Sequence, residues 1–219
     1  MNLGMLKPEI ACERLIGELR EKGIADERVL EAFRRVPRHL FVDGAMQARA
    51  YEDNALPIGG KHGQTISQPY IVALMTELLE LGKDDKILEI GTGSGFQAAI
   101  LAQFSKRVYT VERDRELGDK TRVRLREMGY ANVTFKVGDG TCGWPQWSPF
   151  DRIIVTAGAP VTPETLSAQL AVGGIMIIPM GGREEQELVV YKKTDAGVES
   201  RSAGKVKFVP LIGQHGWSD

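Results

Sequence analysis

Between residues 86 and 180, short apolar runs alternate with stretches in which apolar residues recur every three or four positions. This alternation is typical of βαβ units, which build a mostly parallel sheet with helices on both faces. Runs such as Ile153-Ile154-Val155 contain no polar position, as expected for strands buried on both sides. The expected strands are 86–90, 108–112, 133–137, 152–156 and 175–180, and the expected helices are 96–104, 115–128 and 163–170.

The segments on either side follow other patterns. Periodic apolar residues bounded by Gly or Pro predict helices at 8–22, 27–36 and 69–81, with a short helix within 39–51. Residues 53–68 contain three glycines and a proline, which predicts an irregular loop of the kind that covers binding sites. Stretches 188–193, 198–202 and 205–211 are expected to be antiparallel strands at one sheet edge. We expect one domain with sections 1–82, 83–181 and 182–219.

The turn Gly91-Thr92-Gly93-Ser94-Gly95 joins an apolar strand to the next expected helix, and its glycines permit a close approach to a ligand. Dinucleotide sites use G-x-G-x-x-G to seat pyrophosphate, whereas the third glycine here comes one residue earlier. Glu89 would repel pyrophosphate but can face a cation. Glu89 and the turn therefore favour S-adenosylmethionine, which carries an ammonium and a sulfonium. The alternative is an ordinary tight turn with Glu89 solvated.

Two further acidic residues follow expected strands, and in open parallel sheets the ligand lies at the carboxyl ends of the strands. The carboxylate of Glu112 can accept both hydroxyls of a ribose, unless it is simply a solvated acid. Asp139, within Gly138-Asp139-Gly140, can accept an adenine amino group, or it can close an Asx-type turn.

The end of the fourth strand, Thr156-Ala157-Gly158-Ala159-Pro160, is informative for what it lacks. Amino-nitrogen methyltransferases typically carry Asn or Asp before Pro-Pro-aromatic there, and C5-pyrimidine enzymes carry a Pro-Cys nucleophile. No histidine, lysine or carboxylate is present in this stretch to act as a base. These absences favour an acceptor that needs no deprotonation, such as a carboxylate, whose pKa is about 4.

Composition narrows the setting. A formal net charge of −1 over 219 residues provides no general basic field for nucleic acid, although a local basic patch is compatible with it. Two cysteines and three histidines argue against a zinc site or a disulfide framework, so no metal is expected. No apolar run is long enough to span a bilayer, and the first residues lack a signal-peptide core. A cytoplasmic monomer without a membrane or nucleic-acid partner is expected.

Several motifs together resemble the protein-L-isoaspartate O-methyltransferase family. The glycine turn is common to class I methyltransferases, but G-Q-T-I-S-Q-P is much more specific, and its ending resembles the prokaryotic branch. One mild departure is Phe96, where tyrosine is commoner. The motifs are V-P-R-H-L-F-V (36–42), Y-E-D-N-A-L-P-I (51–58), G-Q-T-I-S-Q-P (63–69), L-E-I-G-T-G-S-G-F-Q-A-A (88–99), F-D-R-I-I-V-T-A-G-A-P (150–160) and F-V-P-L (208–211).

The resemblance implies a class I S-adenosylmethionine-dependent fold, with a Rossmann-like, mostly parallel seven-stranded sheet, N-terminal helices and a C-terminal β addition. It implies methyl transfer to the α-carboxylate of L-isoaspartyl residues, and less well of D-aspartyl residues, in damaged proteins and peptides. The ester then closes to a succinimide that hydrolyses partly to normal aspartate. The family's active-site serine corresponds to Ser67. Its cofactor contacts correspond to Gln64, Thr65, Ile66, Ser67, Glu112, Arg113, Asp139 and Gly140.

Ser67 is expected to orient the substrate carboxylate rather than to act as a nucleophile, because no histidine–acid relay accompanies it. It lies two residues before Pro69, so it can also cap the helix that begins there. Tyr51, Asp53 and His62, in and beside the 53–68 loop, are weaker candidates for substrate contact. Two rival functions remain: a tRNA adenine methyltransferase, and a non-catalytic module that binds S-adenosylmethionine.

Overall fold

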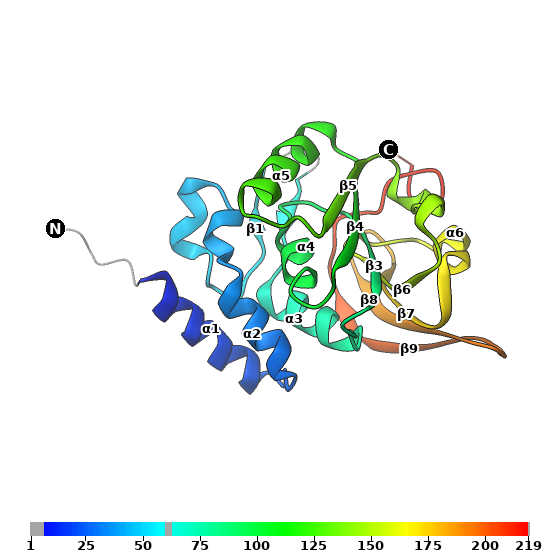
Figure 1. Cartoon of the computed structure of the whole chain (residues 1–219), viewed down its shortest axis with the longest axis horizontal. Helices are drawn as coiled ribbons and strands as arrows, with labels where there is room; N and C mark the ends of the chain where they lie inside the picture. The colour runs from blue at the N-terminus through cyan, green and yellow to red at the C-terminus, as the bar shows by residue number, and fades with distance from the viewer. Residues whose placement is uncertain (1–6, 60–62, 219) are drawn as a thin grey trace.

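The computed structural model describes residues 7–59 and 63–218. Its centre is a seven-stranded sheet in the order β5-β4-β3-β6-β7-β8-β9 (Figure 1). The pairs from β5 to β7 are parallel, whereas β7–β8 and β8–β9 are antiparallel. The strands are β3 Lys86–Ile90, β4 Arg107–Glu112, β5 Val133–Val137, β6 Phe150–Val155, β7 Leu170–Gly181, β8 Gln186–Thr194 and β9 Gly197–Val206. The predicted parallel core and its antiparallel edge are confirmed.

The helices agree with the expected ones in place but are mostly shorter. The helix after the glycine turn ends three residues early, because residues 102–104 form a turn rather than helix. The helix after Pro69 ends at Leu78, and Glu80 then adopts a left-handed conformation with φ of 50°. The α-helices are α1 Pro8–Glu21, α2 Glu27–Arg35, α3 Pro69–Leu78, α4 Phe96–Leu101, α5 Arg115–Glu127 and α6 Glu164–Ala168; 3₁₀-helices are η1 Arg38–Phe41, η2 Gly44–Arg49, η3 Gly140–Cys142 and η4 Pro145–Trp147.

Two expectations outside the core need correction. The 53–68 loop contains a two-stranded antiparallel ribbon, β1 Leu56–Pro57 with β2 Thr65–Ile66, so part of it is regular. Residues 60–62, and with them His62, lie outside the described residues. The strand expected at 205–211 is wrong: β9 absorbs the stretch 198–202 and ends at Val206. Beyond it Pro210, which lacks an N–H, allows only an isolated bridge to Gly158.

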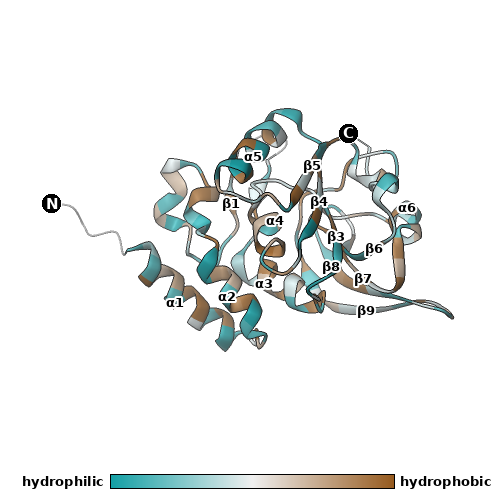
Figure 2. Ribbon diagram, viewed as in Figure 1, coloured by the Kyte–Doolittle hydropathy of each residue, from teal (hydrophilic) through white to brown (hydrophobic). Residues whose placement is uncertain are grey.

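Apolar residues bury both faces of the sheet, and this fixes where the helices lie. Ile87 and Val108 pack with Met75 of α3 on one face, while Leu88 and Val111 pack with Leu166 of α6 on the other. Figure 2 shows apolar and hydrophilic residues alternating along α1 and α2, as expected for helices with one buried side. Among the described residues, no helix is long and apolar enough to cross a bilayer.

Candidate active site

A cavity of about 630 Å³ lies where β3, β4 and β6 end at their carboxyl edge. Segments from distant parts of the sequence form its walls: the turn after β3, the start of α5, the 64–67 stretch and the 209–212 stretch. The predicted site residues that line it are Gln64, Thr65, Ile66, Ser67, Gly91, Thr92, Gly93, Ser94, Glu112, Arg113 and Gly140. The sheet topology therefore gathers most of the candidates in one place.

The glycine turn has the conformation that its sequence predicts. Gly91, Gly93 and Gly95 have φ angles of 93°, 52° and 88°, in the left-handed region that favours glycine. A Cβ on Gly91 would lie 2.4 Å from Oγ1 of Thr156, and one on Gly95 would lie 2.8 Å from Cγ2 of Thr121. Gly95 does not line the cavity itself. Its role is to let the turn pack against α5.

Glu112 lies at the end of β4 with its carboxylate held in place by backbone groups. The Gly93 N–H donates to Oε2 at 2.8 Å, and the Asp114 N–H donates to Oε1 at 2.9 Å. Only 7% of the residue is exposed, and it lines the cavity. An ionised carboxylate accepts about four hydrogen bonds, so each oxygen retains a free acceptor position. Two such positions suit the paired hydroxyls of a ribose.

Glu89 does not occupy the place expected of it. Its side chain is fully buried on the same face of β3 as Ile87, and it is absent from the described residues that line the cavity. The Thr110 hydroxyl, on the neighbouring strand, donates to Oε2, whereas Oε1 has no hydrogen-bond partner within the described part of the chain. Burial raises the pKa of Glu89 to about 8, and the nearby charge of Glu112 adds to the effect. A neutral carboxyl group behind the wall cannot act as the direct counter-charge that the sequence suggested.

Asp139 is also set back from the cavity, although the adjacent Gly140 lines it. Its carboxylate accepts hydrogen bonds from the backbone and hydroxyl of Thr141 and, at 2.7 Å, from the N–H of Gln214. Burial opposes ionisation of Asp139, yet these hydrogen bonds hold its pKa below the usual value. The structure therefore contains the Asx-type turn that was the alternative interpretation. Asp139 also anchors the C-terminal segment against η3.

Ser67 does not cap the helix that follows it. The N-cap residue of α3 is Gln68, and no side chain of the cap residue bonds to the first turn. Asp53 takes that role instead, because its Oδ1 accepts the Tyr70 N–H at 2.7 Å and its Oδ2 accepts a hydrogen bond from Gln68 at 3.0 Å. The alternative structural role proposed for Ser67 is therefore wrong, and its hydroxyl is not committed to the helix start.

A second cavity of about 460 Å³ adjoins the first. It lies between residues 54–55 and 65–68 on one side and, on the other, the β7–β8 connection at 184–185 and the end of β9 with the stretch that follows it, 205–209. Among the described residues, four line both cavities: Thr65, Ser67, Thr156 and Val209. The Thr156 hydroxyl donates to the Gly91 carbonyl at 2.6 Å, so its proton is already used within the fold. Ser67 thus stands at the junction of two chambers.

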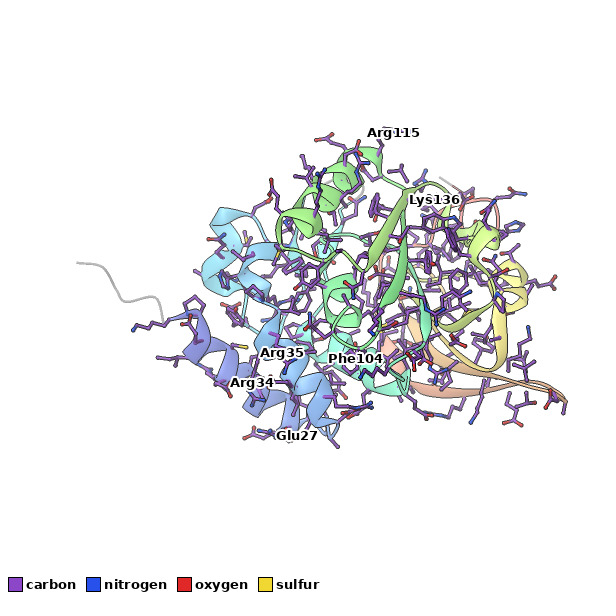
Figure 3. All side chains as sticks on the ribbon, in the orientation of Figure 1. Glu27, Arg34, Arg35, Phe104, Arg115 and Lys136 are labelled. Carbon is purple, nitrogen blue, oxygen red and sulfur yellow. The ribbon has the colours of Figure 1, made fainter. Side chains whose placement is uncertain are left out.

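Several lining residues were not predicted from the sequence. Thr156 directly follows β6, in the stretch 156–160 that the sequence analysis considered only for the base it lacks. Residues 209–212 form one wall of the cavity. They were not predicted as site residues because 205–211 was expected to be an edge strand, although 208–211 was one of the recognised motifs. Arg115, labelled in Figure 3 at the start of α5, and Arg183 carried no periodic or motif signal.

Comparison with known proteins gives consistent matches. The family model described as Protein-L-isoaspartate(D-aspartate) O-methyltransferase (PCMT) matches residues 11–216. A protein-L-isoaspartate O-methyltransferase from Trichlorobacter lovleyi is 54% identical over 218 residues, covering 99% of this chain and 98% of the relative. One from Dictyoglomus turgidum is 53% identical over 205 residues, covering 94% and 92%.

Solved structures agree. A protein-L-isoaspartate O-methyltransferase matches with a TM-score of 0.85 and 31% identity, covering 94% of this chain and 67% of that one. A Plasmodium falciparum structure described under the same enzyme name, in complex with S-adenosyl-L-homocysteine, matches with a TM-score of 0.78 and 25% identity, covering 91% and 97%.

Proposed function

Because the chain belongs to the protein-L-isoaspartate(D-aspartate) O-methyltransferase family, we propose that it methylates isoaspartyl residues of damaged proteins with S-adenosylmethionine. The observation that carries the proposal is the junction of two cavities at Ser67 and Thr156. One chamber suits the methyl donor and the other a peptide side chain. The acceptor is the α-carboxylate of an L-isoaspartyl residue, with D-aspartyl residues as poorer substrates.

The first cavity has the features that S-adenosylmethionine requires. Glu112 retains two acceptor positions for the ribose hydroxyls, and the turn from Gly91 to Ser94 brings backbone close to the ligand. Gln64 to Ser67 close the opposite side, with Arg113 and Gly140 at the end that we assign to the nucleoside. When bound, this cofactor supplies a methyl group activated by a sulfonium centre.

The residues at the junction suit a carboxylate acceptor. A carboxylate is already ionised at neutral pH, so transfer needs orientation but no general base. The four described residues that line both cavities include no acid, histidine or lysine. We assign Ser67 to hold the acceptor by a hydrogen bond from its hydroxyl, which aligns oxygen with the methyl carbon. The opposite charges of acceptor and donor favour their approach in a site that excludes water.

The direct test is a pair of synthetic peptides that differ only in one L-isoaspartyl or normal aspartyl linkage. With radiolabelled S-adenosylmethionine, the isoaspartyl peptide is expected to accept label and the normal peptide almost none. Equal labelling of both peptides would contradict the proposal. Labelling of tRNA instead would favour an adenine methyltransferase, and calorimetric cofactor binding without any labelling would favour a binding module.

Replacing Ser67 by alanine is expected to lower kcat about tenfold for the isoaspartyl peptide, because one hydrogen bond to a charged group is worth about 1.5 kcal/mol or more. Affinity for S-adenosylhomocysteine, measured by calorimetry, should change less than threefold. Ser200→Ala, on the exposed strand β9, is the matched control. A loss of cofactor affinity as large as the loss of kcat would assign Ser67 to cofactor binding alone.

We further propose that the three sections 1–82, 83–181 and 182–219 act as one domain, monomeric and cytoplasmic. Two features support a single domain: β8 and β9 extend the same sheet as the core strands, and the walls of the first cavity come from all three sections. Analytical ultracentrifugation of the purified chain tests the monomer.

A further inference from the structure

Arg38, in η1, is a large cationic side chain that is only 1% exposed. It lies directly behind the Ser67 loop. Its Nη2 donates to the Ser67 carbonyl at 2.7 Å, and its Nε donates to the Ala50 carbonyl at 2.8 Å. The guanidinium carbon lies 4.8 Å from the centre of the Phe96 ring, which itself lines the first cavity. These contacts hold Arg38 between Ala50, in the N-terminal section, and Ser67 and Phe96, which line the first cavity.

The charge of Arg38 is not neutralised by a direct ion pair with any residue in the described ranges. Its Nη1 is buried without a hydrogen-bond partner. Asp53 acts on it at longer range, but that carboxylate already binds Lys22, Gln68 and the Tyr70 N–H. Burial lowers the pKa of Arg38 to about 9, so the group remains charged at neutral pH. A buried cation without a counter-ion is costly, and an anionic ligand nearby would offset that cost.

The peptide group between Ser67 and Gln68 links this cation to the substrate chamber. A trans peptide points its carbonyl and its N–H in opposite directions. Since the carbonyl faces Arg38, the N–H of Gln68 faces away from it, and both Ser67 and Gln68 line the second cavity. A charge-assisted hydrogen bond at the carbonyl polarises the peptide and strengthens the N–H as a donor.

We propose that Arg38 is a positioning residue that makes the Ser67–Gln68 peptide an anion-binding unit for the substrate carboxylate. The inference rests on the proposed function. Arg38 touches neither substrate nor cofactor; it acts through the peptide group, while Ala50 and Phe96 hold its guanidinium in place. The cation also supplies long-range attraction for an acceptor that carries one negative charge.

Arg38→Gln and Arg38→Lys separate the charge from the packing. Arg38→Gln is expected to raise KM for the isoaspartyl peptide about tenfold, while S-adenosylhomocysteine affinity and the melting temperature with cofactor change little. Arg38→Lys keeps a cation that burial makes easier to deprotonate. Its KM should therefore resemble wild type near pH 6 and rise toward that of Arg38→Gln as pH increases, whereas wild type stays flat. Arg35→Gln, on the exposed side of α2, is the control for lost charge (Figure 3).

Other titratable groups lie near Arg38 and could also change KM with pH. Tyr51 and Asp53 face Arg38, Lys22 pairs with Asp53, and His39 is hydrogen-bonded to Tyr51. Their contributions appear equally in the pH profile of Arg38→Gln and are removed by comparison with it.

Three outcomes overturn the inference: a wild-type KM in Arg38→Gln, equal losses of cofactor affinity and KM in both variants, or the same pH profile for Lys and Gln. If Arg38→Gln does not fold, the KM of Arg38→Lys for the isoaspartyl peptide, compared with that of wild type from pH 6 to 8, still tests the inference. Failure of wild type to methylate the isoaspartyl peptide overturns the proposed function instead.

Discussion

Replacing Glu112 by alanine is expected to weaken S-adenosylhomocysteine binding on the order of 100-fold. The carboxylate retains one free acceptor position on each oxygen, and two hydrogen bonds from ribose hydroxyls to a charged group contribute about 3 kcal/mol or more. The same substitution leaves the Gly93 and Asp114 N–H groups without their acceptor, which loosens the turn beside the ligand. Both effects act on the cofactor and neither acts on the peptide.

Isothermal calorimetry with S-adenosylhomocysteine measures this loss directly. Glu127→Ala removes the same charge from the exposed end of α5 and should bind like wild type. A reduction of less than threefold in the Glu112 variant would remove Glu112 from the cofactor site and leave it as a support for the turn. Peptide KM, extrapolated to saturating cofactor, should remain within a factor of about three of wild type.

Replacing Glu89 by glutamine is expected to stabilise the cofactor-free protein by about 2–4 kcal/mol above pH 8 and by almost nothing below pH 5. Burial raises the pKa of Glu89 from 4.5 to about 8, so between these values the folded state holds a proton that the unfolded state has lost. Wild-type stability therefore falls as pH rises through this window. Each unit of pKa difference corresponds to about 1.4 kcal/mol. Glutamine resembles the neutral carboxyl group and can still accept from Thr110.

Denaturant unfolding of both proteins at several pH values tests the expectation. The difference in the free energy of unfolding should grow with pH and level off above pH 8. Glu127→Gln, a neutral substitution at an exposed site, should show no such trend. A constant difference at all pH values would mean that the pKa of Glu89 is the same in the folded and unfolded states.

The parallel core of the sheet and the location of the cavity could be predicted, because both follow from periodicity and connection rules. Apolar runs such as Ile153-Ile154-Val155 permit only a two-sided buried sheet, and parallel strands bring Glu112 and Gly140 to one edge. The tight glycine turn could also be predicted from its sequence. In the structure Gly91 and Gly95 are left-handed and leave no room for a side chain. These features are local in origin or follow from topology alone.

The direction of individual side chains could not be predicted in this way. Glu89 and Asp139 have the correct position along the chain, but one points to the face of Ile87 and the other to Gln214. Which face of the sheet a side chain occupies, and which residue lies opposite it, depend on strand register. Only the folded sheet shows that Glu89 lies opposite Thr110. The partner of Asp139 comes from a segment 75 residues away. Beyond Val206 the expected strand at 205–211 failed for a related reason, because Pro210 there forms only an isolated bridge, to Gly158.

The walls of the first cavity come from residues spread between Gln64 and Ile212. The methyl donor therefore bridges parts of the polypeptide that lie far apart in the sequence. Ligand that binds only the closed state makes opening rarer as its concentration rises. Resistance to proteases should consequently rise with the concentration of S-adenosylmethionine. A cell short of the donor would then have less of this repair activity for two reasons: each molecule turns over more slowly, and the protein is degraded faster.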